Sequence, residues 1–531
     1  MGVYVLMDIL PNKIGKEEWE SVYEESLELI KAYPFMDSTV DYETYRVPWK
    51  YVHRPTEEEM EFGYKDFYLG WHVFGDYETM LSAESFGLFR NIEAYRKDIT
   101  VKDGSDDILA ELINLEVFYD EKNHHIPVGT ANVFDGKTQG FPYHIYILAI
   151  ACLVESRFPK HAVVRGDVSI GQMKKAIDWA NTILKKPIQL TERTNNEKFL
   201  QRIIDIVQDD RTALRSFMSL TMHKKDFTLG NLVREKFSQD VINAYYTDLF
   251  RQYDVNMMGF HNTLRGFFNL GFSIEKACEI CVLNLNGCCF DAKDFAETVL
   301  SMRWSDEKGS YADGEIPLTY NETHSDVPET VYSQFGKTML IAAGLQEKMK
   351  SELSYEDVGN ILHSKLGHKV EIEPMLVNEQ DNDDSDDDSF SQLFSRLKGE
   401  VSREINEPSE NTISDLNNLI LWKKGDTIHP TLEHGISHLK DFVTKFIKNN
   451  DDLLHQFQEY TDYEKIQKLI QLNRFFYIRK ETWEFYIENI NDTNMINAIL
   501  GILSVKAEEV SINKLCKAIV NNVDLLKKYI L

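Results

Sequence analysis

The chain has few cysteines, no excess of basic residues and no long apolar run. Its cysteines are Cys152, Cys278, Cys281, Cys288, Cys289 and Cys516. Six in 531 residues is too sparse for the disulfide framework of a secreted protein. The most apolar segment, 143–154, is shorter than the roughly 20 residues that span a bilayer. The first residues lack the basic and apolar regions of a signal peptide. Together these absences predict a soluble cytoplasmic protein without membrane contact.

Acidic residues dominate the charge. The formal net charge is -28, from 58 basic and 86 acidic residues. A field of this sign repels nucleic acid phosphate and anionic membranes and attracts a basic protein. Residues 421–531 hold 15 basic and 15 acidic residues, so the excess lies in residues 1–420. The charge therefore predicts a basic protein partner and no direct nucleic acid binding.

The densest acidic run lies between 371 and 390, which hold nine acids and no base. Like charges at this density repel one another and favour an extended chain. We therefore predict an acidic disordered linker over 376–411. A calcium loop starting at Asp381 would need Gly sixth and Glu twelfth, where the chain has Asp386 and Gln392. Mimicry of nucleic acid by the acidic run is a further alternative.

The first hundred residues are rich in aromatic and acidic side chains, with 19 aromatics, 20 acids and 10 bases. Alternating apolar residues predict a strand over 3–9, and helical spacing predicts a helix over 16–33 that ends at Pro34. Segment 42–74 has the pattern of strands and turns. Aromatics beside carboxylates suit a binding surface, whereas the alternative is that they fill a core. The predicted partner-binding residues are Trp49, Tyr51, Glu57, Glu58, Glu59, Glu61, Tyr64 and Trp71.

Apolar periodicity predicts mainly helix from 141 to 367 and again from 412 to 531. Ser169 is a predicted N-cap, and 161–167 resembles a short strand and turn. The predicted fold class is α+β, predominantly α-helical, with a small N-terminal α/β unit followed by helical domains. The predicted divisions are an acidic, aromatic-rich α/β domain (1–135), a mainly helical domain (136–375), the linker (376–411) and an all-helical domain (412–531).

Two motifs suggest chemistry only in part. Asp135-Gly-Lys-Thr138 resembles the end of a phosphate-binding loop, but Ala131 occupies the position where that loop needs its first glycine. A surface turn is the better explanation. Cys278-x-x-Cys281 followed by Cys288-Cys289 could hold zinc or do redox chemistry. The surrounding apolar pattern favours a buried helix instead, because free cysteine behaves as a small apolar residue.

His429, His434 and His438 form a candidate metal cluster. His434 and His438 are four residues apart and would share one face of a helix, with His429 or Glu433 supplying a third ligand. The zinc-protease order His-Glu-x-x-His is absent. This spacing suggests the alternative function, a metal-dependent hydrolase.

The leading hypothesis is a cytoplasmic protein-interaction protein. Its acidic N-terminal region would contact a partner with a basic surface, and an inhibitor or immunity-type role against a basic toxin fits this charge. No cofactor is expected, and no motif identifies a reaction, so enzymatic activity stays open.

Overall fold

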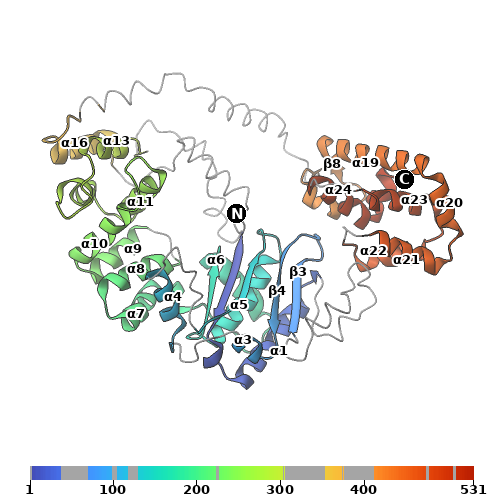
Figure 1. Ribbon diagram of the computed structural model, residues 1–531, viewed down its shortest axis with the longest axis horizontal. Helices are drawn as coiled ribbons and strands as arrows, with labels where there is room; N and C mark the ends of the chain where they lie inside the picture. The colour runs from blue at the N-terminus through green and yellow to red at the C-terminus, as the bar shows by residue number, and fades with distance from the viewer. Residues whose placement is uncertain are drawn as a thin grey trace. The chain divides into compact units, whose positions relative to one another are not determined.

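The structure is a computed structural model. It describes residues 3–36, 70–97, 105–117, 129–222, 226–302, 304, 353–372, 375, 412–473, 477–505 and 510–531. Over these residues the protein is predominantly α-helical with a few small sheets, which confirms the predicted α+β fold class (Figure 1). The chain forms two units, and both are discontinuous in sequence. The first contains Met1–Glu18, Tyr95–Gly140 and His144–Gly399, and the second contains Trp19–Ala94, Phe141–Tyr143 and Glu400–Leu531.

The first unit contains an antiparallel sheet with β1 (Tyr4–Ile9) between β5 (Ala131–Lys137) and β6 (Ala162–Gly166). The apolar residues at every second position of β1 are buried, as expected for a strand with one face against a core. Helix α5 (His144–Arg157) contacts β1 and β6. The predicted strand near residues 3–9 and the predicted strand and turn at 161–167 are therefore confirmed.

Helices make up most of the rest of the described first unit. They are α3 (Glu93–Arg96, which crosses the unit boundary), α4 (Ile108–Val117), α6 (Ile170–Asn181), α7 (Asn196–Val207), α8 (Asp210–Leu220), α9 (Phe227–Lys236), α10 (Gln239–Phe250), α11 (Met258–Asn269), α12 (Ile274–Cys278), α13 (Ala292–Leu300) and α16 (Tyr355–Leu366), with short 3-10 helices η1 (Pro11–Lys13) and η4 (Glu192–Thr194) and the π-helix η5 (Glu279–Leu283). The predicted cap of α6 is confirmed. Ser169 Oγ accepts from the Gln172 backbone N–H at 3.2 Å, and Gln172 Oε1 accepts from the Ser169 N–H at 2.9 Å. This reciprocal capping fixes where the helix begins.

Aromatic side chains fill the helical core of the first unit. The Tyr246 ring lies edge-on to Phe267 and Phe272, with centroids 4.6 and 5.3 Å apart. Helix α9 approaches the end of α11 very closely, since a Cβ added at Gly230 would lie 1.8 Å from the Leu270 carbonyl oxygen. Glycine is therefore the residue that lets these two helices meet.

The second unit begins with α1 (Lys16–Ala32), whose first turn belongs to the first unit. It packs on a sheet of order β2 (Phe35–Met36), β3 (Gly70–Asp76) and β4 (Ser82–Phe89). Trp19 Nε1 donates to the Phe89 carbonyl at 3.0 Å, which fixes the helix on the hairpin. The predicted helix over 16–33 is confirmed.

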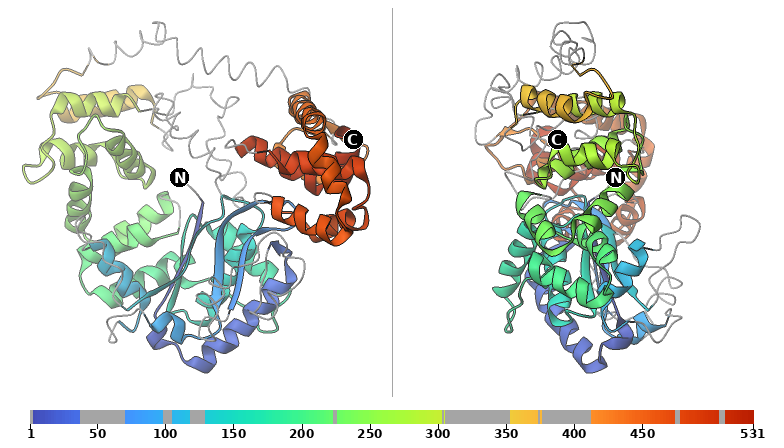
Figure 2. Two further views of the ribbon diagram at one scale, coloured as in Figure 1. Left: turned by 45° about the vertical axis from the view of Figure 1, so that its right-hand side comes forward. Right: turned by 90° about the vertical axis from the view of Figure 1, so that its left-hand side faces the viewer.

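The C-terminal part of the second unit is a helical bundle, coloured orange to red in Figures 1 and 2. Its elements are β7 (Thr412–Ile413), η7 (Leu416–Leu421), β8 (Thr427–Ile428), α19 (Pro430–Asn449), α20 (Asp451–Glu459), α21 (Asp462–Leu472), α22 (Lys480–Glu488), α23 (Thr493–Leu503), α24 (Val510–Asn521) and α25 (Val523–Tyr529). Strands β7 and β8 form a short parallel pair. None of the helices that the structure describes is long and apolar enough to cross a membrane.

The turn between β3 and β4 packs into this helical bundle. Met80, at the turn, is 0% exposed and belongs to the same apolar core as the C-terminal helices. Tyr77 Oη donates to Glu481 Oε2 at 2.8 Å and accepts from the Lys480 N–H at 3.0 Å. Lys517 Nζ donates to the Met80 carbonyl. The turn therefore links the N-terminal hairpin to helices more than 400 residues away.

Several predictions fall outside the described residues. These are most of segment 42–74, residues 305–352 of the stretch predicted to be mainly helical, and the whole of the acidic linker 376–411. The boundaries at 135, 375 and 411 stay predictions. Strand β1 of the predicted first domain pairs with β6 of the predicted second, so packing in this region joins segments that are distant in sequence.

Candidate functional site

The solvent face of α1 carries a row of glutamates. Glu20, Glu24 and Glu28 follow at four-residue spacing, which places them on one side of the helix. Glu24 and Glu28 are exposed and Glu20 is partly exposed. We call these three residues the α1 acidic row. Because like charges at this spacing repel one another by a few tenths of a kcal/mol, the row does not stabilise the helix.

The helix dipole also does not stabilise the last member of the row, Glu28. Glu17 and Glu18 lie in the first turn of α1, where negative charge is favourable. Glu28 lies near the other end, where the dipole disfavours negative charge. Arg90 Nη2 is 4.0 Å from Glu24 Oε1, but both side chains are more than half exposed, at 56% and 60%. Water screens such a contact, so the row keeps most of its negative field.

Most of the predicted partner-binding residues lie outside the described part of the chain. These are Trp49, Tyr51, Glu57, Glu58, Glu59, Glu61 and Tyr64. The eighth, Trp71, lies in β3 with 1% of its surface exposed, and its Nε1 donates to Ser26 Oγ at 2.9 Å. Its inclusion is therefore corrected, because an indole buried between α1 and the hairpin cannot meet a partner. Trp71 follows the alternative considered for these aromatics, which is that they fill a core.

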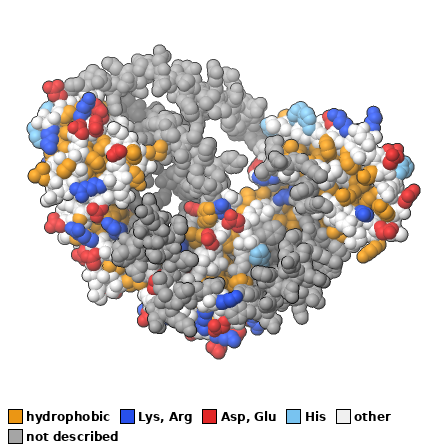
Figure 3. All heavy atoms as spheres, in the orientation of Figure 1, with side chains coloured by type: hydrophobic (Ala, Val, Ile, Leu, Met, Phe, Trp, Pro, Cys, Tyr) orange, Lys and Arg blue, Asp and Glu red, His pale blue; other side chains and the backbone are white. Residues whose placement is uncertain are grey.

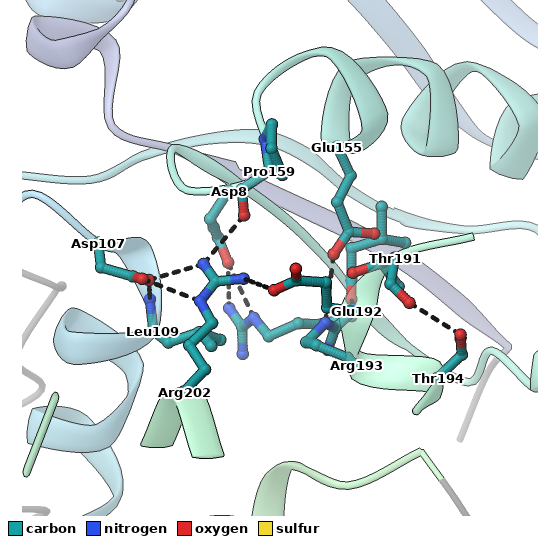
Figure 4. Close-up of polar contacts among 12 residues, drawn as sticks. Asp8, Asp107, Leu109, Glu155, Pro159, Thr191, Glu192, Arg193, Thr194 and Arg202 are labelled. Atoms are coloured by element: carbon teal, nitrogen blue, oxygen red, sulfur yellow. Dashed lines mark hydrogen bonds and ion pairs between the residues drawn. The ribbon is translucent and has the colours of Figure 1, made fainter. Parts of the chain in front are cut away.

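A network of arginines and carboxylates surrounds the sheet of the first unit (Figure 4). Asp8 on β1 is 3% exposed and accepts from Arg165 Nε on β6 at 2.9 Å. Its other oxygen accepts from Asn132 Nδ2 on β5 at 3.0 Å. One buried carboxylate thus holds side chains from all three strands.

A second ion pair, Glu155 with Arg193, lies at the edge of β6 that does not pair with β1. Glu155 on α5 and Arg193 are 3% and 4% exposed, and Arg193 Nε donates to Glu155 Oε1 at 3.2 Å. Arg193 Nη2 also donates to the carbonyl of Val164 in β6. A side chain therefore occupies a hydrogen-bonding position that an unprotected edge strand would offer to another chain.

A third ion pair, Arg202 with Asp107, connects α7 to the start of α4. Arg202 Nε and Nη2 donate to the two oxygens of Asp107 at 2.9 and 2.8 Å, a bidentate arrangement. Arg202 Nη2 also donates to the Pro159 carbonyl at 2.9 Å, and Asp107 accepts from the Leu109 N–H at 2.9 Å. This pair organises the fold and leaves no charge for binding.

These three pairs indicate where the negative surplus of the chain resides. The carboxylates of Asp8, Glu155 and Asp107 are each matched by one arginine, whereas the buried Asp76 and Glu111 accept from the backbone N–H groups of Thr79 and Ser105. Unmatched charge inside a protein is strongly unfavourable, so such matching is expected. The surplus therefore belongs on the surface, where it can act on other molecules.

The predicted histidine cluster lies at the start of α19. His429 caps the helix, its Nδ1 accepting from the Thr431 N–H at 3.4 Å. The Nε2 atoms of His434 and His438 are 2.9 Å apart on the exposed face of the helix. Pale-blue histidine side chains are visible on the surface of the C-terminal helices in Figure 3. Within the described ranges, no group of three or more His, Cys, Asp or Glu residues is placed to hold a metal ion.

The sequence resembling a phosphate loop has a different structure from the expected surface turn. Asp135, Gly136 and Lys137 are the last residues of β5 and pair with β1. Thr138 is 0% exposed, and its hydroxyl bonds inside the unit. The expectation was wrong because strand pairing with β1, a contact across more than 120 residues, determines this segment.

The cysteine prediction is confirmed in part. Cys278 and Cys281 are 0% exposed, on α12 and the π-helix that follows it. Cys288 is partly exposed and Cys289 is exposed. All six cysteines are free thiols.

A cavity of about 370 Å³ lies in the helical part of the first unit, and nothing in the sequence identified it. Its lining residues are Asn256, His261, Glu297, Thr298, Leu300, Ser301 and Met375. Burial lowers the pKa of His261, helped by the nearby Arg265. The volume falls within the range of small-molecule sites, but the residues come from the turn before α11, from α11, from α13 and its C-cap, and from Met375, segments that share no sequence motif.

Comparison with known proteins gives no relative: no family model matches the chain, and no curated protein and no solved structure matches it either. The functional argument therefore depends on the chemistry of the chain itself.

Proposed function

We propose that this is a cytoplasmic protein-interaction protein whose acidic N-terminal region binds a partner with a basic surface. The observation that carries the proposal is the α1 acidic row, which is exposed at Glu24 and Glu28 and partly exposed at Glu20, and whose like charges repel one another along the helix that bears them. Surface features that reduce stability are retained for a function more readily than for folding. An inhibitor or immunity-type role, in which the acidic face covers the basic site of a toxin, is the form that this chemistry fits best.

The rest of the chain supports this proposal. Asp8, Glu155 and Asp107 are each matched by an arginine, so these three pairs contribute nothing to the net charge of -28. Complementary charge accelerates association and selects against wrong partners. Glu57, Glu58, Glu59 and Glu61, predicted from the sequence as partner contacts, would add further negative charge to the N-terminal region.

The first experiment identifies the partner. The protein is purified gently from its own host and examined by native mass spectrometry, where a retained basic polypeptide supports the proposal. If the purified protein has no second polypeptide bound to it under these conditions, the result counts against the proposal. Polylysine serves as a control for binding that depends on charge alone.

The second experiment locates the contact. Glu20→Lys, Glu24→Lys and Glu28→Lys are combined, and association with the identified partner is measured at low and physiological salt. We expect the association rate at low salt to fall by about tenfold and its salt dependence to weaken. A second variant reverses Glu57, Glu58, Glu59 and Glu61 in the same way.

A matched control carries the same change of charge elsewhere. Asp441→Lys, Glu459→Lys and Glu488→Lys lie on exposed positions of the C-terminal helices. These substitutions should leave the salt dependence close to that of the wild type. If the control weakens binding as much as the variants in the N-terminal region, net charge acts without a defined contact and the proposed surface is wrong.

The second candidate is a metal-dependent hydrolase, favoured by the 2.9 Å approach of His434 Nε2 to His438 Nε2. Two imidazoles at this spacing can share a transition metal. Elemental analysis of the protein purified without chelator tests this candidate. Less than about a tenth of a zinc, iron or manganese per chain would exclude it, because a functional site retains its metal with high affinity.

A further inference from the structure

An irregular stretch of backbone in the first unit contains Cys278, Cys281, Cys288 and Cys289. Helix α12 continues into the π-helix Glu279–Leu283, where the Asn284 N–H donates to the Glu279 carbonyl at 2.9 Å. π-helical turns account for well under about 1% of residues and occur often at functional sites. A tight turn follows, in which Cys289 has a left-handed backbone with φ of 58°.

The turn returns to lie directly beside the π-helix. The Cys288 N–H donates to the Ile280 carbonyl at 2.8 Å, and the Phe290 N–H donates to the Cys281 carbonyl at 2.8 Å. The side chains of Cys281 and Cys288 are also hydrogen-bonded to each other, so the two sulfur atoms are in contact. Gly287 permits this approach, because a Cβ there would lie 2.2 Å from the Ile280 carbonyl oxygen. The chain therefore holds Cys281 and Cys288 next to each other.

The two thiols differ in environment. Cys281 is fully buried, and burial keeps its pKa well above the usual value. Its S–H donates to Cys288, and this hydrogen bond, together with the nearby Arg251 guanidinium, lowers the pKa of Cys288. Arg251 is fixed in place by donating to the carbonyls of Gly287 and Asn286. Partial burial of Cys288 and the nearby Asp248 act in the opposite direction, and the protonated thiol donates to the Thr247 carbonyl at 3.7 Å, but the net effect lowers the pKa of Cys288. Cys288 is thus the nucleophilic thiol, and Cys281 is the protonated thiol behind it.

We propose that Cys281 and Cys288 are a redox-active pair that hydrogen peroxide oxidises to a disulfide. The Cys288 thiolate attacks one peroxide oxygen, the O–O bond breaks, and the released hydroxide takes a proton to become water. Cys288 is then a sulfenic acid. Cys281 sulfur attacks the Cys288 sulfur, the S–O bond breaks, and the hydroxide leaves as water with the Cys281 proton. Two thiols and one peroxide give one disulfide and two waters, and a thiol reductant reverses the change.

The test uses the full chain with about one equivalent of hydrogen peroxide at neutral pH, followed by alkylation, chymotryptic digestion and mass spectrometry. Cleavage after Leu283 and after Phe290 separates Cys278 and Cys281 from Cys288 and Cys289. We expect two linked peptides that separate on reduction. The combined variant Cys278→Ser and Cys289→Ser retains only the proposed pair in this region and should form the same link.

Two further variants test the separate roles. Cys288→Ser should lose the link and give no dimedone adduct in this region. Cys281→Ala should also lose the link but accumulate a dimedone adduct on Cys288, because the sulfenic acid no longer has a thiol to attack it. Circular dichroism of each variant confirms folding.

Three outcomes would overturn the proposal. The first is a Cys278→Ser and Cys289→Ser variant that folds but forms no link. The second is an adduct that stays on the more exposed Cys289, which would mean that exposure alone determines reactivity. The third is a Cys281→Ala variant without an adduct on Cys288.

Discussion

His144 illustrates how its surroundings set the protonation state of a single residue. Its ring is 0% exposed, and burial lowers its pKa to about 4. The Thr138 hydroxyl donates to the Val3 carbonyl at 3.3 Å and therefore accepts from His144 Nδ1 at 2.6 Å. The imidazole, at the start of α5, is thus neutral at pH 7 and bonds to Thr138, the residue that follows β5.

This burial predicts a loss of stability in mild acid. The folded pKa of His144 lies below the unfolded value of 6.5, so the native state binds fewer protons than the unfolded state between these values. Stability therefore falls as the pH drops from about 6.5 to about 4, by up to about 3 kcal/mol from this residue. His144→Asn keeps a donor for Thr138 but cannot titrate. Thermal melts at pH 7, 6, 5 and 4.5 should show a shallower loss for this variant than for the wild type.

The control for this prediction is His455→Asn, because the His455 side chain is 79% exposed. Its melting temperatures should follow the wild type at every pH. If His144→Asn loses stability with the same slope as the wild type, the buried imidazole does not control the acid response.

At the scale of elements, helix packing depends on where glycine is placed. Gly230 on α9 lies against the Leu270 carbonyl at the end of α11, whereas Gly266 within α11 has no atom within 4 Å of the position its Cβ would occupy. Arg234 reinforces the same contact, because its Nη1 donates to the Leu270 carbonyl at 2.9 Å. Two glycines in neighbouring helices therefore have opposite roles.

Alanine at these two positions should have opposite effects. Gly230→Ala places a methyl group within 1.8 Å of a carbonyl oxygen, so α9 and α11 must separate and expose core around them. We expect a loss of about 1–3 kcal/mol or more, as in other overpacked cores. Gly266→Ala removes backbone freedom from the unfolded chain and should stabilise by about 0.5–1 kcal/mol. Urea unfolding of the two variants measures both changes, and equal effects would mean that the close approach is absent.

Local elements were the part of the fold that sequence reasoning predicted well. The Ser169 cap, the first strand and the helix over 16–33 depend on neighbouring residues, and all three were found. Asp135–Lys137 and Trp71 were misassigned because strand pairing and burial depend on distant partners. Of the predicted partner contacts, Trp71 alone lies in the described chain, and the α1 acidic row was missed although its four-residue spacing is visible in the sequence.

At the scale of the whole molecule, the second unit joins the N-terminal hairpin to the C-terminal helices. Met80 is buried in their core, and Tyr77 bonds to α22. Arg479, at the start of α22, donates to the Glu78 carbonyl. The unit is therefore assembled from both halves of the chain.

This arrangement predicts that the folded protein survives a break in its chain. A protease site introduced near residue 400 and cut after folding should leave two fragments that elute together in size-exclusion chromatography. Met80→Asp should release the C-terminal fragment, because it places a charge in an apolar core. Met258→Asp is the matched control, since Met258 is 42% exposed. Fragments that separate without the Met80 substitution would contradict the packing described.

The same turn imposes an order of events during synthesis. Met80 and Lys517, which bond to each other, are 437 residues apart in sequence. A ribosome adding about 5–20 residues per second needs roughly 20–90 s to travel between them. Throughout that interval the nascent hairpin presents an apolar tip whose binding site has not been made, so the growing chain should be a client of ribosome-associated chaperones until its last helices emerge.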